Sequence, residues 1–344
     1  MHRLLFLPLL LLLGAAACKH SGSTAPKPVV PVDTTVYPFY RGADISWVTE
    51  MEDSGRVFFD KAGVQQDLFV LLKAQGLNAV RLRVWVNPAN RYNALPDVIA
   101  KARRAQAAGL KLMIDFHYSD NWADPGKQFK PAAWEAYSFP QLKAAVYDHT
   151  FSTLSALKAA GLTVSWVQVG NEVADGMLWP DGKASTHMAA FAALVDTGYA
   201  AVKAVDTAQK VIVHVDNGYD NGRFRWLFDG LTTNGARFDI IGMSLYPPTG
   251  QGLSYADQCY YNAADMLDRY GKPVMVVEIG MPANQAAECR RFISRLISRM
   301  KSLPKGRGQG VFYWEPQAYR WRNYGLGAWG DDGRPTQAME GFTD

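Results

Sequence analysis

Eight short apolar segments rich in β-branched residues recur from about residue 40 to the end of the chain, and each ends in polar or aromatic residues. Helical stretches separate most of them, and several stop at a glycine, such as Gly76, Gly109 or Gly161, which suits the position just after a helix. Near-continuous apolar strands that alternate with helices favour a parallel sheet. Eight such units in about 300 residues predict an α/β fold, a single (β/α)8 TIM barrel. The predicted strands are Gly42–Trp47, Ala79–Val86, Lys111–His117, Ser165–Glu172, Lys210–Asp216, Phe238–Tyr246, Pro273–Glu278 and Gly310–Glu315.

The first residues form no part of this pattern. Residues 1–17 have a positive charge at Arg3, a short apolar run and then small residues, as a secretory signal peptide does. The small residues lead into Cys18 and so resemble a bacterial lipobox, which implies cleavage before Cys18 and lipidation of its thiol. An ordinary signal peptide with a cysteine nearby is the alternative. Residues 18–38 are rich in Ser, Thr and Pro and are predicted to be a flexible tether, and residues 39–344 to be the barrel domain.

From this leader we expect an exported lipoprotein, anchored in a membrane through Cys18 and displayed at the outer membrane or the cell surface. The 36 basic and 32 acidic residues give a net charge of +4, and the basic residues are scattered, so we expect no nucleic-acid partner. We expect the chain to act as a monomer. Aromatic residues are 12% of the chain and include 10 Trp, a composition that hints at a surface for sugars.

Two cysteines remain besides Cys18. Because an exported protein meets an oxidising compartment, Cys259 and Cys289 are a candidate disulfide, with a pair of free buried thiols as the alternative. Two cysteines without a nearby histidine do not suggest a metal site.

Polar residues end nearly every predicted strand, and in a (β/α)8 barrel the chemistry lies at the carboxyl ends of the strands. Period-2 alternation places Arg81 and Arg83 on one side of their strand. It likewise groups Val274 and Val276 with Glu278. If these are the inward sides, the polar residues converge on one mouth of the barrel. They are Asp44, Arg81, Arg83, Asp115, His117, Asn171, Glu172, His214, Asp216, Ser244, Tyr246, Glu278, Trp314 and Glu315.

Two of these residues form a pair suited to glycoside hydrolysis. Glu172 follows the fourth predicted strand and Glu278 ends the seventh, so only a closed barrel brings them together. In such a pair one carboxyl protonates the leaving oxygen while the other attacks the anomeric carbon. An ionised nucleophile raises the pKa of its partner and keeps it protonated. Arg81 or Arg83 beside the nucleophile would hold it ionised, and Tyr246 could donate a hydrogen bond to it.

Six local strings strengthen this interpretation. Together they resemble glycoside hydrolase family 53 of clan A, the endo-β-1,4-galactanases, and the resemblance runs from about residue 40 to 344. The strings at residues 115–128 and 167–180 are the most specific of the six. They are GADISWV (42–48), VRLRVWVNP (80–88), DFHYSDNWADPGKQ (115–128), VQVGNEVADGMLWP (167–180), VVEIGMP (276–282) and FYWEPQ (312–317).

The resemblance implies that Glu172 is the general acid/base and Glu278 the nucleophile of a retaining double displacement. It implies as substrate the β-1,4-linked galactan side chains of pectin or type I arabinogalactan. Some relatives hold calcium in the loop after the eighth strand. Here that loop has only Asp331 and Asp332 as acidic residues beyond Glu315, so we expect no metal and no cofactor.

Further residues at the strand ends and in the loops after them are candidates for substrate contact. Exposed indoles there can stack on the apolar face of a sugar. Trp134, Trp166 and Trp226 lie elsewhere and are interpreted as packing residues. The candidates, besides Asn171 as a supporting residue of the catalytic pair, are Asp44, Trp47, His117, Trp122, Asp124, Trp179, His214, Asp216 and Trp314.

Two alternatives remain open. Another clan A endo-glycanase, a β-mannanase or β-xylanase, would use the same two glutamates. A non-catalytic glycan-binding surface lipoprotein would need tryptophan platforms and a tether but not the two opposed glutamates.

Overall fold

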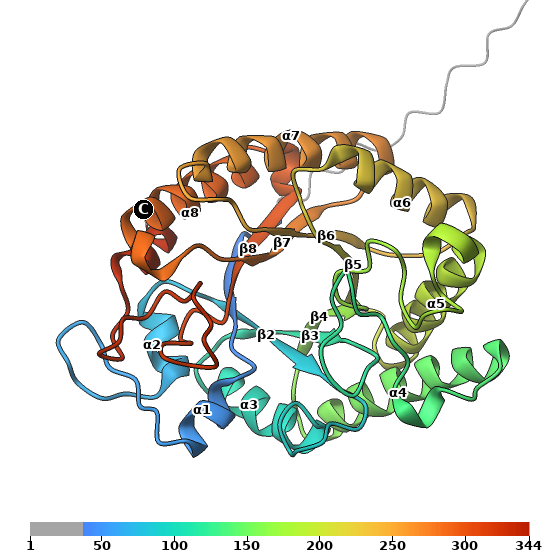
Figure 1. Cartoon of the computed structure of the whole chain (residues 1–344), viewed down its shortest axis with the longest axis horizontal. Helices are drawn as coiled ribbons and strands as arrows, with labels where there is room; N and C mark the ends of the chain where they lie inside the picture. Colours follow the sequence, from blue (N-terminus) through green and yellow to red (C-terminus); the bar gives the residue numbers. More distant parts are fainter. Residues whose placement is uncertain (1–36, 344) are drawn as a thin grey trace, which may run out of the picture. The chain divides into compact units, whose positions relative to one another are not determined.

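The computed structural model describes residues 37–343, and within them eight parallel strands close into one barrel in sequence order. Figure 1 shows the strands in the middle and the helices around them. The signal peptide, Cys18 and nearly all of the predicted tether lie outside the described residues. The predicted barrel is confirmed. The strands are β1 (Tyr40–Asp44), β2 (Ala79–Val84), β3 (Lys111–Phe116), β4 (Val164–Val169), β5 (Lys210–Val215), β6 (Ile240–Leu245), β7 (Val274–Ile279) and β8 (Gly308–Trp314).

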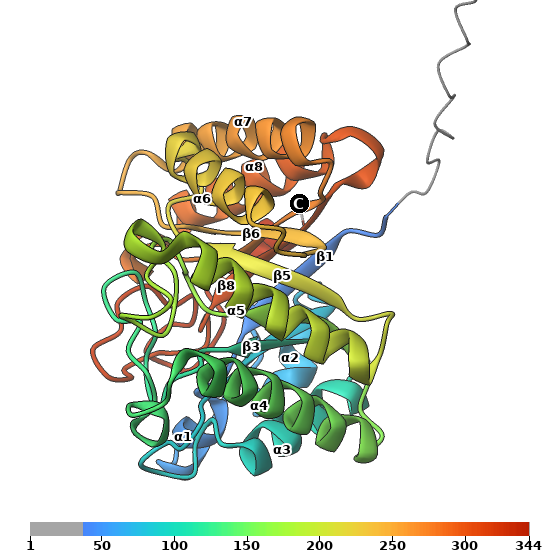
Figure 2. The same ribbon diagram turned by 90° about the vertical axis from the view of Figure 1, so that its right-hand side faces the viewer.

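Helices connect successive strands on the outside. Two precede β2, and one long helix lies between each later pair of strands. The helices are α1 (Val48–Asp53), α2 (Leu68–Ala74), α3 (Leu95–Ala107), α4 (Phe139–Ala159), α5 (Ala184–Val205), α6 (Asn221–Thr233), α7 (Gly252–Tyr270) and α8 (Ala286–Lys301), with short 3₁₀ turns at Ala132–Trp134, Ala283–Gln285, Pro304–Gly306 and Gln337–Phe342. By length and composition α5 could cross a membrane, and in this fold it packs on β4, β5, α4 and α6. The long loops after β3 and β8 lie at one end of the barrel, on the left in Figure 2.

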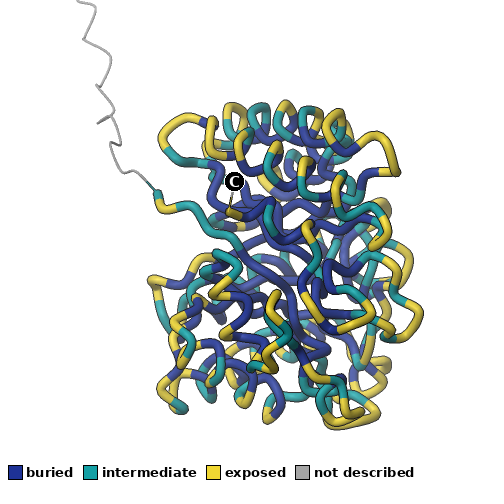
Figure 3. The backbone as a smooth tube through the Cα atoms, turned by 90° about the vertical axis from the view of Figure 1, so that its left-hand side faces the viewer, coloured by how far each residue is buried: buried dark blue, intermediate teal, exposed yellow. Residues whose placement is uncertain are grey.

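Two apolar clusters fill the molecule, one between strands and helices and one inside the barrel. Figure 3 shows the buried strands in dark blue and the exposed outer turns in yellow. Alternation assigns residues to each: Val80 and Leu82 of β2 pack outward against helices, whereas Arg81 and Arg83 are buried on the inner side. The inner cluster consists of Ala79, Met113, Trp166, Ile212, Ile240, Met275, Val277 and Phe312.

The alternation predicted for β7 is wrong. Val274 and Val276 belong to the outer cluster, whereas Met275 and Val277 face the interior. Strict alternation would therefore turn Glu278 outward. The register shows what prevents this: between its pairings of Val276 and Ile279, β7 carries one residue more than β8 opposite it, and a matching shift occurs against β6. A bulge of this kind re-aims a side chain, and here it turns Glu278 into the barrel mouth.

The predicted disulfide is also wrong, because both cysteines are free and buried. Cys259 of α7 lies 3.9 Å from Met243 Sδ of β6. Cys289 of α8 lies 3.7 Å from Tyr313 Oη of β8. Each thiol thus packs against a different strand, and burial raises the pKa of both thiols to about 12.

Candidate active site

A pocket of about 350 Å³ opens at the carboxyl end of the barrel. Both glutamates line it, so the predicted convergence of Glu172 and Glu278 is confirmed. The predicted residues in its wall come from β3, β4, β6, β7 and β8 or the loops after them. The lining is His117, Trp122, Ala123, Asp124, Asn171, Glu172, Tyr246, Glu278, Trp314, Tyr324 and Leu326.

Glu278 is held by a cation and a phenol. Arg81 Nη1 lies 2.8 Å from its Oε1, and Tyr246 Oη donates to its Oε2 at 2.9 Å. The two contacts occupy different oxygens, so the carboxylate plane is fixed. Of the two arginines proposed beside the nucleophile, Arg81 is therefore the one in place.

Glu172 stands on a tight turn just past the end of β4. Gly170 begins the turn at φ 88°, and a side chain there would meet Val173 Cγ1 at 2.5 Å. Glu172 itself has φ 47°, a left-handed conformation that costs a non-glycine residue energy and is often found at functional sites. The turn leaves Glu172 half-buried, and its Oε1 accepts a hydrogen bond from Ser244 Oγ at 2.7 Å.

A neutral imidazole supports that serine. His214 Nδ1 lies 3.0 Å from the Nε2 of Gln168, which can only donate, so Nδ1 accepts and the proton is on Nε2. His214 Nε2 then donates to Ser244 Oγ at 2.7 Å, and the serine proton points to Glu172. Burial and the charge of Arg81 hold the pKa of His214 well below its usual range, which keeps this arrangement in place.

The two carboxyls differ in how strongly they retain a proton. Burial raises the pKa of both, and the nearby charge of Glu278 raises that of Glu172 further. Arg81 opposes the rise mainly at Glu278, whose pKa is about 7, whereas the pKa of Glu172 is raised well above the ordinary value. Glu278 therefore ionises first and Glu172 keeps its proton, the order that a nucleophile and an acid need.

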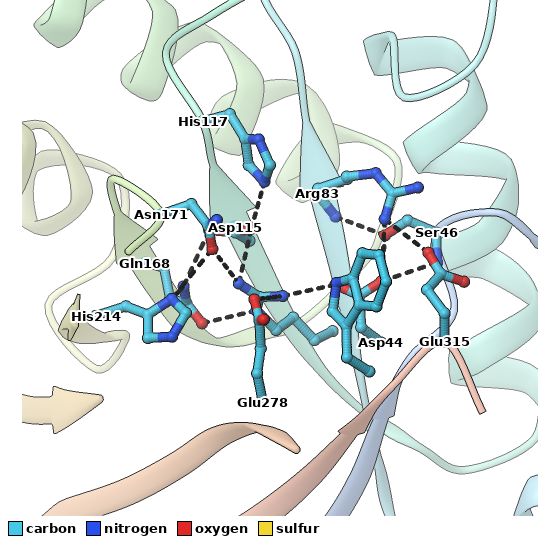
Figure 4. A network of polar contacts seen from close by, with 12 residues as sticks. Asp44, Ser46, Arg83, Asp115, His117, Gln168, Asn171, His214, Glu278 and Glu315 are labelled. Atoms are coloured by element: carbon cyan, nitrogen blue, oxygen red, sulfur yellow. Dashed lines mark hydrogen bonds and ion pairs between the residues drawn. The ribbon is translucent and has the colours of Figure 1, made fainter. Parts of the chain in front are cut away.

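Arg81 connects most of the polar residues of the mouth. Its guanidinium contacts Asp44 at 2.7 Å, Asp115 at 2.9 Å and Asn171 at 2.7 Å, and its Nε donates to Gln168 at 2.7 Å. Figure 4 shows these partners around the base of the site. Negative neighbours raise the pKa of Arg81, so it stays charged. A buried guanidinium whose N–H groups all have partners holds the residues around it in fixed positions.

Arg83 has a different role from the one considered for it. Its Nη1 donates to Glu315 Oε1 at 2.6 Å, and both side chains are almost fully buried. Four indoles surround the guanidinium, with ring centres at 4.4 Å (Trp122), 5.3 Å (Trp47), 5.7 Å (Trp85) and 6.0 Å (Trp314). Arg83 thus supports Trp122 and Trp314 from beneath by cation–π contact and does not touch Glu278 in the described contacts.

Four predicted substrate-contact residues are buried and do not line the pocket. Asp44 and His214 are fully buried in the network, and Trp47 is 6% exposed behind Trp122 and Trp314. Asp216 is 8% exposed and accepts from Arg223 Nη1 through both oxygens and from Asn217 Nδ2 at 2.8 Å. These four hold other residues in place.

Trp179 is not part of the pocket lining. Its Nε1 donates to Asp175 O at 2.8 Å, and its ring makes an edge contact with Phe129, which is 62% exposed. Its backbone N–H donates to Gln128 O, and Gln128 Nε2 donates to Asn171 O at 2.8 Å. It therefore stands beside the turn that carries Glu172.

Ser244 was placed at the barrel mouth from the sequence, and its contact with Glu172 is a role that the sequence did not assign. Three further contributors were not singled out as site residues. Gln168 accepts from Arg81 and occupies an inward position of its strand, which strand alternation could have revealed. Gln128 and Tyr324 come from irregular loops, where no periodicity marks an inward side chain.

Within residues 37–343, no group of three or more His, Cys, Asp or Glu side chains is placed to hold a metal ion. The acid/base and nucleophile candidates are carboxyls on this chain.

A closed parallel barrel defines a glycoside hydrolase that uses two carboxyls when one pocket holds a proton-retaining carboxyl just after β4 and an ionisable carboxyl near the end of β7. The sequence profile of Glycosyl hydrolase family 53 matches residues 40–342, and the chain belongs to that family.

Known relatives agree with this membership. An uncharacterised protein from Niallia circulans is 38% identical over 81% of this chain and 83% of its own length. The arabinogalactan endo-beta-1,4-galactanase of Thermothelomyces thermophilus is 35% identical over 80% of this chain and 89% of its own. A solved fungal beta-1,4-galactanase structure is 31% identical, with a TM-score of 0.81 over 88% of this chain and 98% of that chain. Xylanase 10B from Thermotoga maritima, at 12% identity and a TM-score of 0.62, shares the fold alone.

Proposed function

We propose that the protein is an endo-β-1,4-galactanase that cleaves the galactan side chains of pectin or type I arabinogalactan. Family 53 is a family of retaining galactanases, and relatives with that activity are about one-third identical to this chain over most of its length. The observation that carries the proposal is the pair Glu172 and Glu278 in one pocket, with Ser244 on the first and Arg81 and Tyr246 on the second.

In the first step a carboxylate oxygen of Glu278 forms a bond to the anomeric carbon of the reacting galactosyl unit. The bond from that carbon to the O4 of the next unit breaks, and O4 takes the proton of Glu172. The tyrosine and arginine on Glu278 keep it ionised and aimed before attack. The product of this step is a galactosyl ester of Glu278 and a shortened chain with a free hydroxyl.

In the second step Glu172, now ionised, takes a proton from water while the water oxygen attacks the same carbon. Glu278 leaves as a carboxylate, with its charge again stabilised by Arg81. Two inversions restore the original anomeric configuration, and both glutamates return to their starting protonation states.

A reducing-end assay on linear β-1,4-galactan, mannan, xylan and cellulose tests the substrate. We expect release of new reducing ends from galactan, in a mixture of oligosaccharides, and at least a hundredfold less from the other three. Faster cleavage of mannan or xylan would favour another clan A specificity. Binding to galactan with no cleavage, unchanged on replacement of Glu172, would favour a glycan-binding lipoprotein.

We further propose that the chain is an exported lipoprotein, anchored through a lipid on Cys18 at the outer membrane or cell surface and acting there as a monomer. The apolar leader of residues 1–17 and the Ser-, Thr- and Pro-rich residues 18–38 support an anchor followed by a tether. An enzyme for a polymer too large to import is useful at that location.

A further inference from the structure

A second hollow lies beside the active-site pocket, on the side of Glu172. It has a volume of about 340 Å³, close to the lower limit of ligand pockets, and is lined by Pro125, Ala174, Asp175, Arg223 and Trp226. Two chain connections join it to the pocket. Pro125 follows Asp124 of the pocket wall, and Ala174 comes two residues after Glu172.

Trp226 is the unusual member of this lining. It lies on α6, whose buried face consists of Phe224, Leu227, Phe228 and Leu231 at helical spacing. Trp226 is off that face and 45% exposed. Its ring has no aromatic or cation–π partner among residues 37–343, unlike Trp134, which contacts His149, or Trp166, which contacts Tyr40. Trp226 is therefore a surface residue and not part of the core.

The polar members of the hollow are already oriented. Arg223 binds Asp216 through Nη1 and approaches Asp220 through Nε at 3.6 Å, and the described contacts leave its Nη2 without a protein partner. Asp175 is fixed by Ser185, whose N–H and hydroxyl donate to it at 2.7 and 3.0 Å. An exposed indole beside a fixed donor and a fixed acceptor is the chemistry that binds a pyranose.

We propose that this hollow is a subsite for a galactosyl unit on the leaving-group side of the scissile bond, with Trp226 as its platform and Arg223 and Asp175 as its polar contacts. The inference rests on the proposed galactanase function. Glu172 protonates the oxygen that leaves, so the departing chain lies on its side of the pocket. The hollow is lined by the loops after β3 and β4 and by α6, which follows β5, whereas Glu278 and Trp314 come from β7 and β8.

The test compares a substrate that reaches the hollow with one that does not. We expect Trp226→Ala to lower the ratio of kcat/KM on galactohexaose to that on an aryl β-galactobioside at least fivefold, because stacking is lost only on the longer substrate. Trp226→Phe should recover at least half of the ratio. With reducing-end-labelled galactohexaose, Trp226→Ala should also shift cleavage toward the reducing end, since fewer units then gain from lying beyond Glu172.

Tyr261→Ala is the matched control, because Tyr261 is 65% exposed on α7, outside both cavities. It should leave both the ratio and the cleavage position as in the wild type. If Trp226→Ala has wild-type thermal stability and its kcat/KM ratio is within twofold of the wild-type value, the subsite proposal is wrong. The proposed galactanase function is unaffected by that result. A wild-type protein inactive on galactan would overturn both.

Discussion

Arg81 Nη1 lies 2.8 Å from Glu278 Oε1, and the two side chains are 1% and 6% exposed. Burial alone would raise the pKa of this carboxyl further and favour its protonated form. The arginine offsets much of that effect, and the pKa of Glu278 is about 7. The same arginine lowers the pKa of Glu172 only weakly. The two pKa values therefore differ: Glu278 loses its proton near neutral pH and Glu172 keeps its proton.

This separation predicts a bell-shaped pH dependence of kcat/KM. Activity should rise with pH as Glu278 ionises near pH 7 and fall again at higher pH as Glu172 loses its proton. The hydrogen bond from Tyr246 favours the ionised form of Glu278, so Tyr246→Phe should raise that pKa and move the acidic limb to higher pH. The measurement is kcat/KM on a galacto-oligosaccharide, whose leaving group needs the proton of Glu172, from pH 4 to pH 10.

Ser244→Ala is the complementary variant in the same experiment. Ser244 donates to Glu172, and its loss should raise the pKa of Glu172 and move the alkaline limb upward while the acidic limb stays in place. If Tyr246→Phe moved the alkaline limb instead, the roles of the two glutamates would have to be exchanged.

Glu172→Gln should remove the proton donor and keep the nucleophile. We expect a loss of several orders of magnitude on galactan and a much smaller loss on an aryl galactoside, whose leaving group needs little protonation. Isosteric replacement keeps the contact with Ser244 in place. Equal losses on the two substrates would contradict the acid/base role.

The barrel could be predicted from the sequence because eight repeated units carry the same signal. Glu172 and Glu278 were found because they end strands in specific strings. The reason Glu278 faces inward was not predictable by alternation: one extra residue in β7 reverses the parity after Val277, and periodicity does not mark a bulge. The sequence also did not show which polar side chains at the strand ends are buried. Asp44 and His214 look like ligands for a substrate at strand ends, but other side chains already occupy their polar atoms.

Arg83 and Glu315 offer a test of the buried support beneath the tryptophans. Burial raises the pKa of Glu315 to about 8 even with the arginine in contact. Arg83→Met should destabilise the fold by about 1–3 kcal/mol, since it removes a hydrogen-bond donor from the buried carboxyl and the cation from four indoles. Arg83→Met with Glu315→Gln should recover part of that loss. Denaturant unfolding of the four proteins measures the coupling, and additive effects would contradict it.

Cys18→Ala tests the anchor without touching the barrel. We expect the wild-type protein in the membrane fraction, and the variant either released in soluble form or retained as an unprocessed precursor. Soluble variant protein should cleave galactan with wild-type kcat/KM. Recovery of wild-type protein as a soluble species with an unmodified Cys18 thiol, shown by mass spectrometry, would refute the lipoprotein proposal.

Trp122 and Asp124 form the wall of the pocket that the loop after β3 supplies. Trp122 presents its ring between Trp85, Trp47 and Trp314, and Asp124 lines the same pocket with its side chain 38% exposed. In β-1,4-galactan each unit is linked through the axial O4 of the next, and this bends the chain. Recognition of the bent chain needs an aromatic face for stacking and a polar group aimed at the edge of the sugar.

Trp122→Ala and Asp124→Ala should therefore each lower kcat/KM on galactan at least tenfold, about 1.4 kcal/mol or more. Trp122→Phe separates stacking from packing, because it keeps an aromatic face over Arg83, which lies 4.4 Å from the Trp122 ring centre. We expect Trp122→Phe to retain thermal stability and to recover part of the activity, as measured by unfolding and by initial rates on linear galactan. Wild-type rates in both alanine variants would mean that the galactan chain follows another wall of the pocket.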